Sequence, residues 1–97
     1  MTYQIVLAPE AVEDLKRLKA NVRGTVRNAI EEYLRHQPTR ASKARIKRLR
    51  GLSRPQFRLR VGEVRIFYDV SGKTVEILAV VLKSEADVWL RRVGESR

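Results

Sequence analysis

Three arginines in the middle of the chain are spaced so that their side chains should gather on one face of a β-hairpin: Arg58, Arg60 and Arg65. Within residues 56–68, two β-favouring runs are separated by only two residues, the first of them Gly62. This spacing favours a hairpin with a type II′ turn, in which Arg60 lies directly opposite Arg65. Because like charges opposite one another destabilise a sheet, this arginine-rich face is expected to bind an anion such as a phosphate.

Arginine and lysine suit different parts of a reaction at a phosphate. A guanidinium group binds two phosphate oxygens at once and stays charged, so Arg58 and Arg65 suit charge stabilisation and are poor general bases. Lys83, directly after the apolar run 75–82, is the one plausible proton carrier in this region. An ordinary surface lysine at the end of a strand is an equally good interpretation of it. Phe67 falls on the same face, where we favour packing against arginine stems over stacking on a base.

A second group of cations lies upstream, between residues 40 and 54, with no acidic residue among them. We expect these side chains to bind RNA phosphates and to make association dependent on salt. The members assigned to substrate binding, together with Arg60, are Lys47, Arg48 and Arg50. A solvated charge run is the alternative interpretation, which the lack of acidic neighbours weakens.

The composition limits the class of protein. The chain has 97 residues and a formal net charge of +10, with a pI of about 10.9. We therefore expect one small basic domain over residues 1–97, with nucleic acid, an anionic membrane or an acidic protein as partner. The absence of cysteine excludes disulfides, cysteine-bound zinc and a thiol nucleophile. With no signal peptide and no apolar run long enough to span a membrane, we expect a cytoplasmic protein without membrane contact.

The N-terminal part of the chain should form a layer that supports the hairpin. Residues 3–7 predict a strand, and a helix should follow with Pro9 in its first turn. A second helix, capped by Asn21 and ended by Pro38, completes an antiparallel αα-hairpin. His36, the single histidine, is expected to interact with the end of this helix rather than to act in catalysis. We expect this layer to cover the apolar side of the sheet, so that the arginine side faces outward.

The remaining elements complete an α+β fold. Residues 39–54 favour no single structure, because their apolar positions fit a helical turn or an irregular strand edge. Residues 75–82 predict a strand covered on both faces, and Ser84 is expected to cap a short helix that contains Trp89. The fold class is therefore a two-layer sandwich, with an N-terminal strand and an αα-hairpin packed on an antiparallel sheet and a short C-terminal helix.

The order of these elements and the sequence of the hairpin resemble the RelE/ParE superfamily of bacterial toxins from type II toxin–antitoxin modules. The most specific part is the stretch FRLRVGEVRIFY at residues 57–68, with Leu49-Arg50-Gly51 upstream. The resemblance implies one of two activities. RelE-like members cut mRNA in the ribosomal A site without a metal or other cofactor, whereas ParE-like members inhibit DNA gyrase and are not nucleases. In both groups a cognate antitoxin holds the toxin inactive. For this chain the resemblance implies a cognate antitoxin as partner, and a heterotetramer or larger assembly with it is one expectation.

The resemblance also assigns roles to single residues. Arg58 and Arg65 fall at phosphate-binding or catalytic positions of RelE-like members, and Lys83 falls where many carry an arginine. Trp89 falls near a tyrosine credited with base stacking or proton chemistry, so it is assigned to substrate binding, with a core anchor as the equal alternative. Gln56 falls where some relatives carry a lysine, and it cannot carry a proton.

The leading interpretation is a ribosome-dependent mRNA endoribonuclease that blocks translation, with Arg58, Arg65 and Lys83 as catalytic residues. The lack of a histidine and a tyrosine at the site favours two alternatives. One is a gyrase inhibitor without an active site of its own, and the other is a toxin-fold protein that has lost its activity and only binds.

Overall fold

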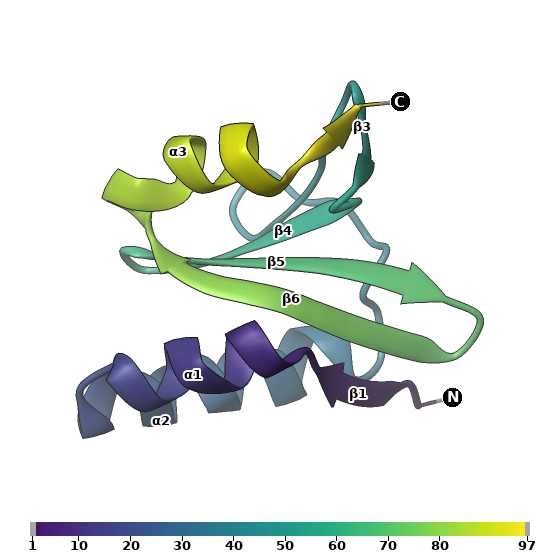
Figure 1. Cartoon of the computed structure of the whole chain (residues 1–97). Helices are drawn as coiled ribbons and strands as arrows, with labels where there is room; N and C mark the ends of the chain where they lie inside the picture. The colour runs from purple at the N-terminus through teal and green to yellow at the C-terminus, as the bar shows by residue number, and fades with distance from the viewer. Residues whose placement is uncertain (1, 97) are drawn as a thin grey trace.

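A five-stranded mixed sheet forms the centre of the molecule in the computed structural model, which describes residues 2–96 (Figure 1). The strand order is β1-β6-β5-β4-β2. The strands are β1 Gln4–Leu7, β2 Ile46–Arg48, β4 Phe57–Val61, β5 Val64–Ser71 and β6 Thr74–Leu82. The N-terminal strand β1 pairs in parallel with β6, and the other neighbours are antiparallel. The predicted α+β class is confirmed, with β1 as a parallel strand at one edge.

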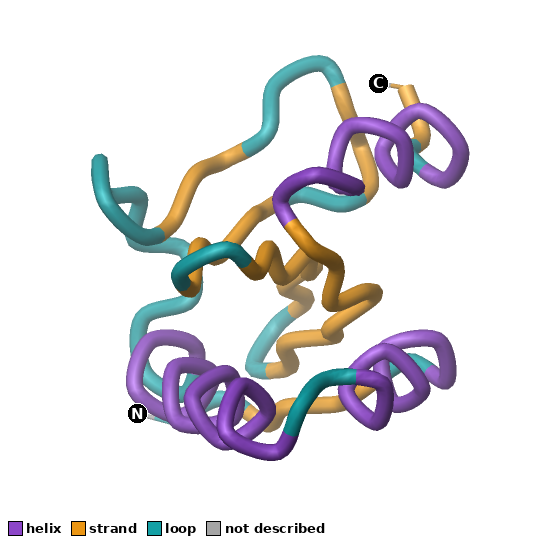
Figure 2. The backbone as a smooth tube through the Cα atoms, turned by 90° about the vertical axis from the view of Figure 1, so that its left-hand side faces the viewer, coloured by secondary structure: helices purple, strands orange, loops and turns teal. Residues whose placement is uncertain are grey.

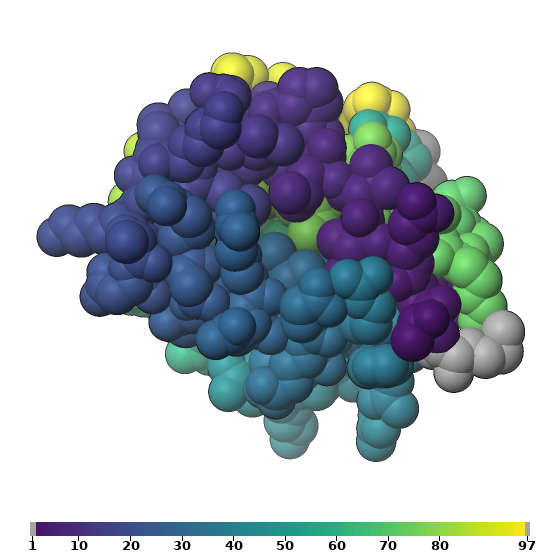
Figure 3. Space-filling view, turned by 90° about the horizontal axis from the view of Figure 1, so that it is seen from below, coloured from purple at the N-terminus to yellow at the C-terminus, as the bar shows by residue number. Residues whose placement is uncertain are grey.

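Two helices cover one face of this sheet, below it in Figure 1. Helix α1 spans Pro9–Arg17, with proline at its start as predicted, and α2 spans Ala20–Ala29. A single π-helical segment, η1 Ile30–Leu34, continues α2. The second helix begins earlier than predicted, because Lys19 and not Asn21 stands at its N-cap position. Figure 3 shows this helical layer from below, with α1 in purple and α2 in blue.

The main core lies between this helical layer and the sheet. Its members on the hairpin are those predicted from the alternation of the sequence: Phe57, Leu59, Val61, Val64, Ile66 and Tyr68. The predicted register is also confirmed, since Val61 pairs with Val64 and Arg60 with Arg65. Gly62 has a φ of 57°, and no other residue type in the described chain has a positive φ. A type I′ turn, which needs two such residues, is therefore excluded, in agreement with the predicted type II′ turn.

Short strands resolve the ambiguity of residues 39–54. Strand β2 is an edge strand that pairs with β4. Strand β3, Leu52–Arg54, pairs instead with β7, Glu95–Ser96, in a separate two-stranded sheet that joins the C-terminal tail to this segment. Three-residue strands are too short to show a hydrophobic period, so the sequence pattern could not distinguish them from a helical turn.

The C-terminal helix α3, Lys83–Val93, packs on the opposite face of the sheet (Figures 1 and 2). The prediction that Ser84 caps this helix is wrong: the helix begins at Lys83, and Leu82 occupies the N-cap without a side-chain bond. Trp89 on α3 and Phe67 on β5 belong to a second core, which also contains Leu49, Leu78, Ala79 and Ala86. The arginine side of the sheet is therefore covered in part, and the prediction that it faces outward holds only away from α3. Within residues 2–96, no helix is long and apolar enough to cross a membrane.

Candidate functional site

The register of the sheet brings the predicted cations of the hairpin together. Lys47 of β2 lies opposite Arg58 of β4, which in turn lies opposite Phe67 of β5. One pair further along, Arg60 lies opposite Arg65. Since neighbouring strands are about 4.8 Å apart, these four cations form one basic surface, which we name the arginine face: Lys47, Arg58, Arg60 and Arg65.

Arg58 is at the centre of the arginine face and is half-buried. Its Nε is buried and has no hydrogen-bond partner in the described chain. Burial, and then the positive charges of Arg65 and Arg60, lower the pKa of the Arg58 guanidinium from its ordinary value. Arginine remains charged in proteins even so. A buried donor without a partner is costly, and a bound anion would supply both the missing acceptor and the missing negative charge.

Arg65 relieves the like-charge contact with Arg60 in a way that the sequence did not indicate. Its side chain is only 7% exposed, and its Nη1 donates to the backbone carbonyls of Gly62 at 2.8 Å and Val64 at 3.1 Å. The guanidinium group is thus turned toward the end of the hairpin, while Arg60 stays exposed to solvent. Arg65 consequently holds the turn, and Arg58 and Arg60 are the arginines that the face presents.

Lys83 lies at the same end of the sheet as the hairpin turn. Its backbone N–H donates to the carbonyl of Glu63 at 2.7 Å, and the neighbouring pair is Val64 with Leu82. The side chain is exposed at the first position of α3. The fold therefore brings Lys83 next to the turn that Arg65 holds, although the two residues are far apart in sequence.

The assignment of Trp89 to substrate binding requires a correction. The indole is 4% exposed and stacks on Phe67, with ring centroids 4.9 Å apart and an angle of 7° between the planes. Its Nε1 donates to Glu10 Oε2 at 2.9 Å. With so little of the indole exposed, a nucleobase has no access to it, and the core-anchor alternative applies.

Gln56 has a structural position as well. Its backbone N–H donates to Asp69 Oδ1 at 2.8 Å, and its side-chain Oε1 accepts the N–H of Val70 at 2.9 Å. Asp69 also lies 3.4 Å from Arg54. Asp69, at the end of the second hairpin strand, is therefore engaged elsewhere and does not neutralise the arginine face.

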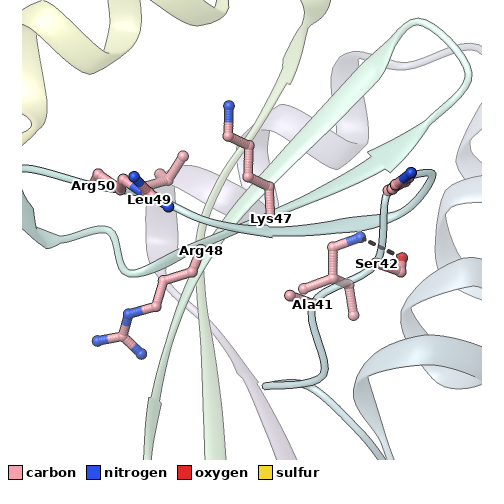
Figure 4. A pocket seen from close by; sticks show the side chains of 8 residues that line it. Ala41, Ser42, Lys47, Arg48, Leu49 and Arg50 are labelled. Atoms are coloured by element: carbon pink, nitrogen blue, oxygen red, sulfur yellow. Dashed lines mark hydrogen bonds between the residues drawn. The ribbon is translucent and has the colours of Figure 1, made fainter.

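The upstream cations line a cavity of about 780 Å³ beside strand β2 (Figure 4). Its basic side chains are Lys43, Lys47, Arg48 and Arg50. Lys47 and Arg48 project to opposite sides of the strand, and Arg48 lies over the ring of Phe57 at 5.2 Å. Of the predicted substrate-binding residues, Lys47 therefore lies beside Arg58 on the arginine face. Arg50 lines the same cavity as Lys47. Arg48 projects to the opposite side of β2, over Phe57.

The family of the chain follows from a comparison with known families. The model of the ParE toxin of type II toxin–antitoxin systems, parDE, matches residues 5–87. The chain belongs to the RelE/ParE superfamily of type II toxins. No curated protein matches this toxin significantly.

Solved structures of related toxins share its fold. The RelB–RelE complex of Methanococcus jannaschii is 26% identical, with a TM-score of 0.67 over 87% of this chain and 96% of that one. The RelBE2 complex of Mycobacterium tuberculosis is also 26% identical, with a TM-score of 0.67 over 84% and 99% of the two chains. A mutant of Escherichia coli RelE in the free state, 21% identical, has a TM-score of 0.69 over 96% and 99%. At that lower identity the likeness concerns the fold alone.

Proposed function

We propose that this toxin is a metal-independent, ribosome-dependent mRNA endoribonuclease that blocks translation from a single domain spanning residues 1–97. The observation that carries the proposal is the buried Nε of Arg58, which lacks a hydrogen-bond partner within residues 2–96 and lies among further cations. A phosphate of RNA supplies the acceptor and the charge that this group lacks. A rigid β-hairpin holds the guanidinium before substrate arrives, which is the condition for effective charge stabilisation of a transition state.

The reaction that fits these residues is internal transfer at an RNA phosphate. The 2′-oxygen of the substrate attacks phosphorus, its proton passes to water, and the bond from phosphorus to the 5′-oxygen breaks. Arg58 and Arg60 stabilise the charge that develops on the phosphoryl oxygens. Lys83, as an ammonium group, donates a proton to the departing 5′-oxygen. The products are a 2′,3′-cyclic phosphate and a 5′-hydroxyl, so atoms and protons balance without a further reagent.

Arg65 contributes to this reaction by holding other residues of the site in place. Its bonds to the carbonyls of Gly62 and Val64 fix the end of the hairpin that carries Arg60 and adjoins Lys83. The predicted catalytic role of Arg65 is thus restated as a positioning role, while Arg58 and Lys83 keep theirs.

A translation extract tests the proposal. Purified toxin is added to an extract that translates a defined message, and the 5′ ends of the fragments are mapped by primer extension. We expect new ends within translated codons, and no new ends when initiation is blocked. An intact message under active translation contradicts the proposal.

A ParE-like inhibitor of DNA gyrase is the second candidate, and a specific observation favours it. The matching family model is that of ParE, and the burial of Trp89 removes one residue that an mRNA endoribonuclease was expected to use for substrate binding. A gyrase supercoiling assay with the purified toxin distinguishes the two: inhibition together with an intact message supports this candidate. A third possibility, a toxin fold retained only for binding, is supported if expression without antitoxin leaves growth unchanged.

The partner that we propose is a cognate antitoxin. The related RelE structures from M. jannaschii and M. tuberculosis are complexes of a toxin with its antitoxin. With a net charge of +10, this toxin favours an acidic binding segment in that antitoxin, in a heterotetramer or larger assembly. A target on the ribosome places its action in the cytoplasm.

A further inference from the structure

The aromatic side chains of this toxin are all engaged within the molecule, which limits how it can recognise a nucleic acid. The chain has one tryptophan, three tyrosines and two phenylalanines, and all of them lie in the described residues. Proteins that bind single-stranded nucleic acid usually stack bases on exposed rings of this kind. Whether any ring is open to a base is therefore a direct question for the structure.

The rings nearest the arginine face are closed. Phe67 is 0% exposed and stacks on Trp89, which is 4% exposed. On the opposite face of the sheet, Phe57 stacks on Tyr68 at 5.4 Å, and the hydroxyl of Tyr68 donates to the carbonyl of Pro38 at 2.6 Å. Neither pair offers a face to solvent.

Cations cover the rings that are closer to the surface. Arg45 lies over Tyr33 at 5.2 Å. Lys73 lies over Tyr3 at 4.7 Å. Tyr3 and Tyr33 are partly buried and pack against the main core. Within residues 2–96, the rings on the hairpin and on α3 are buried, so none beside the arginine face offers an uncovered face on which a base can stack.

The cations, in contrast, form a continuous path without bound acids. Lys43, Lys47 and Arg50 line the cavity beside β2, Lys47 lies opposite Arg58, and Arg60 follows on the same strand. Within residues 2–96, none of these side chains forms a salt bridge (the ion pairs involve Lys16, Arg17, Arg35 and Arg54 instead). We name this path the phosphate track: Lys43, Lys47, Arg50, Arg58 and Arg60.

We infer that the toxin binds single-stranded RNA through the sugar–phosphate backbone alone, along the phosphate track, and does not distinguish the bases. This inference rests on the proposed function, because it describes the substrate at the same arginine face. Cations recognise phosphates irrespective of sequence, and without an aromatic ring for stacking the affinity lacks the largest contribution that depends on the base. Any preference for particular codons in cleavage then comes from the ribosome and not from the toxin.

Binding of short oligonucleotides to the full chain tests this inference without any need for cleavage. Fluorescence anisotropy is measured with 12-mers of A, C and U, with an abasic 12-mer, and with one whose phosphates are methylphosphonates. We expect Kd values within about threefold for the three homopolymers and the abasic strand, and a loss of at least tenfold for the uncharged backbone. A tenfold preference for one base, or a tenfold loss with the abasic strand, overturns the inference.

A salt titration with matched variants locates the site. With five cations bound to phosphates, the slope of log K against log salt should be about −3.5 for a single strand, and Lys43→Gln with Lys47→Gln should reduce it to about −2. The control pair, Lys19→Gln with Arg27→Gln, removes two exposed cations from the helical layer and should leave the slope near −3.5. Equal slopes for the two pairs overturn the assignment of the track, as does the absence of binding at low salt. If the toxin does not bind the oligonucleotides at low salt but still cleaves message on the ribosome, the proposed function stands and this inference alone fails.

Discussion

Trp89 and Phe67 stack with their ring centroids 4.9 Å apart and their planes 7° from parallel, and this contact joins α3 to the sheet beside the arginine face. The stack explains why a position that resembles a base-binding tyrosine is closed to RNA here. It also means that a change at Trp89 should affect stability before it affects recognition of substrate.

Two substitutions separate these effects. Trp89→Ala removes a nearly buried indole and should lower the free energy of unfolding by about 3–5 kcal/mol. Trp89→Phe keeps a ring on Phe67 but loses the bond to Glu10, so a loss of about 1–2 kcal/mol is expected. Urea unfolding measures both. Cleavage per folded molecule should be unchanged in Trp89→Phe, whereas a selective loss of RNA affinity in this variant would show that the indole contacts a base.

We expect both the stability of the fold and the cleavage of RNA to depend on Arg65. Arg65→Ala removes the donor to two carbonyls at the end of the hairpin, and we expect a loss of about 1–3 kcal/mol. Arg65→Lys restores one donor and should recover part of the stability and part of the cleavage. Thermal unfolding and primer extension on the same samples check this. Full stability in Arg65→Ala together with lost cleavage would instead assign Arg65 to direct contact with the phosphate.

A change from glycine to alanine should have opposite effects on the free energy of unfolding at two positions. Gly62 has a φ of 57° at the hairpin turn, so Gly62→Ala forces a left-handed conformation on alanine and should cost about 1–2 kcal/mol. Gly24 lies inside α2 and has open space where a Cβ would be, so Gly24→Ala should stabilise by about 0.5–1 kcal/mol. Thermal unfolding of the two variants should show shifts in opposite directions. A stable Gly62→Ala would mean that the turn can adopt another type.

The hairpin and the C-terminal helix show what the sequence could and could not predict. A two-residue link beginning with Gly62 leaves one register, and that register fixes which arginines share a face, so both followed from the sequence. The position of α3 did not, because an amphipathic helix with Trp89 on its apolar side can cover any apolar surface within reach. The buried Arg65 was missed for the same reason: its partners are backbone carbonyls, which have no sequence signal.

The buried carboxylate of Asp14 should make the stability of the fold depend on pH. Asp14 accepts the backbone N–H of Val80 at 2.9 Å and pairs with Arg17, and burial is the main cause of its raised pKa. An acid with a raised pKa in the folded state stabilises the fold most when protonated, and this contribution is lost as pH rises through the raised value. Relative to Asp14→Asn, which keeps one acceptor for Val80, the wild type should therefore lose stability as pH rises from below about 4 to neutrality.

Denaturation by urea across this range measures the difference between the two proteins. Asp14→Ala serves as the comparison, since it leaves the Val80 N–H without a partner and should be less stable than Asp14→Asn by about 1–3 kcal/mol at every pH. A difference between wild type and Asp14→Asn that grows in favour of the wild type with rising pH would show that the carboxylate is stabilised as an anion.

Arg58 is proposed to bind the phosphate at which the message is cut. The most direct test compares wild type, Arg58→Ala and the control Arg27→Ala in a translation extract, with codon-bounded ends counted by primer extension. Arg58→Ala should lose about 10²-fold in cleavage rate, and Arg27→Ala, which removes an exposed cation from the helical layer, should cut as the wild type does. Cleavage by Arg58→Ala at the wild-type rate would contradict the account.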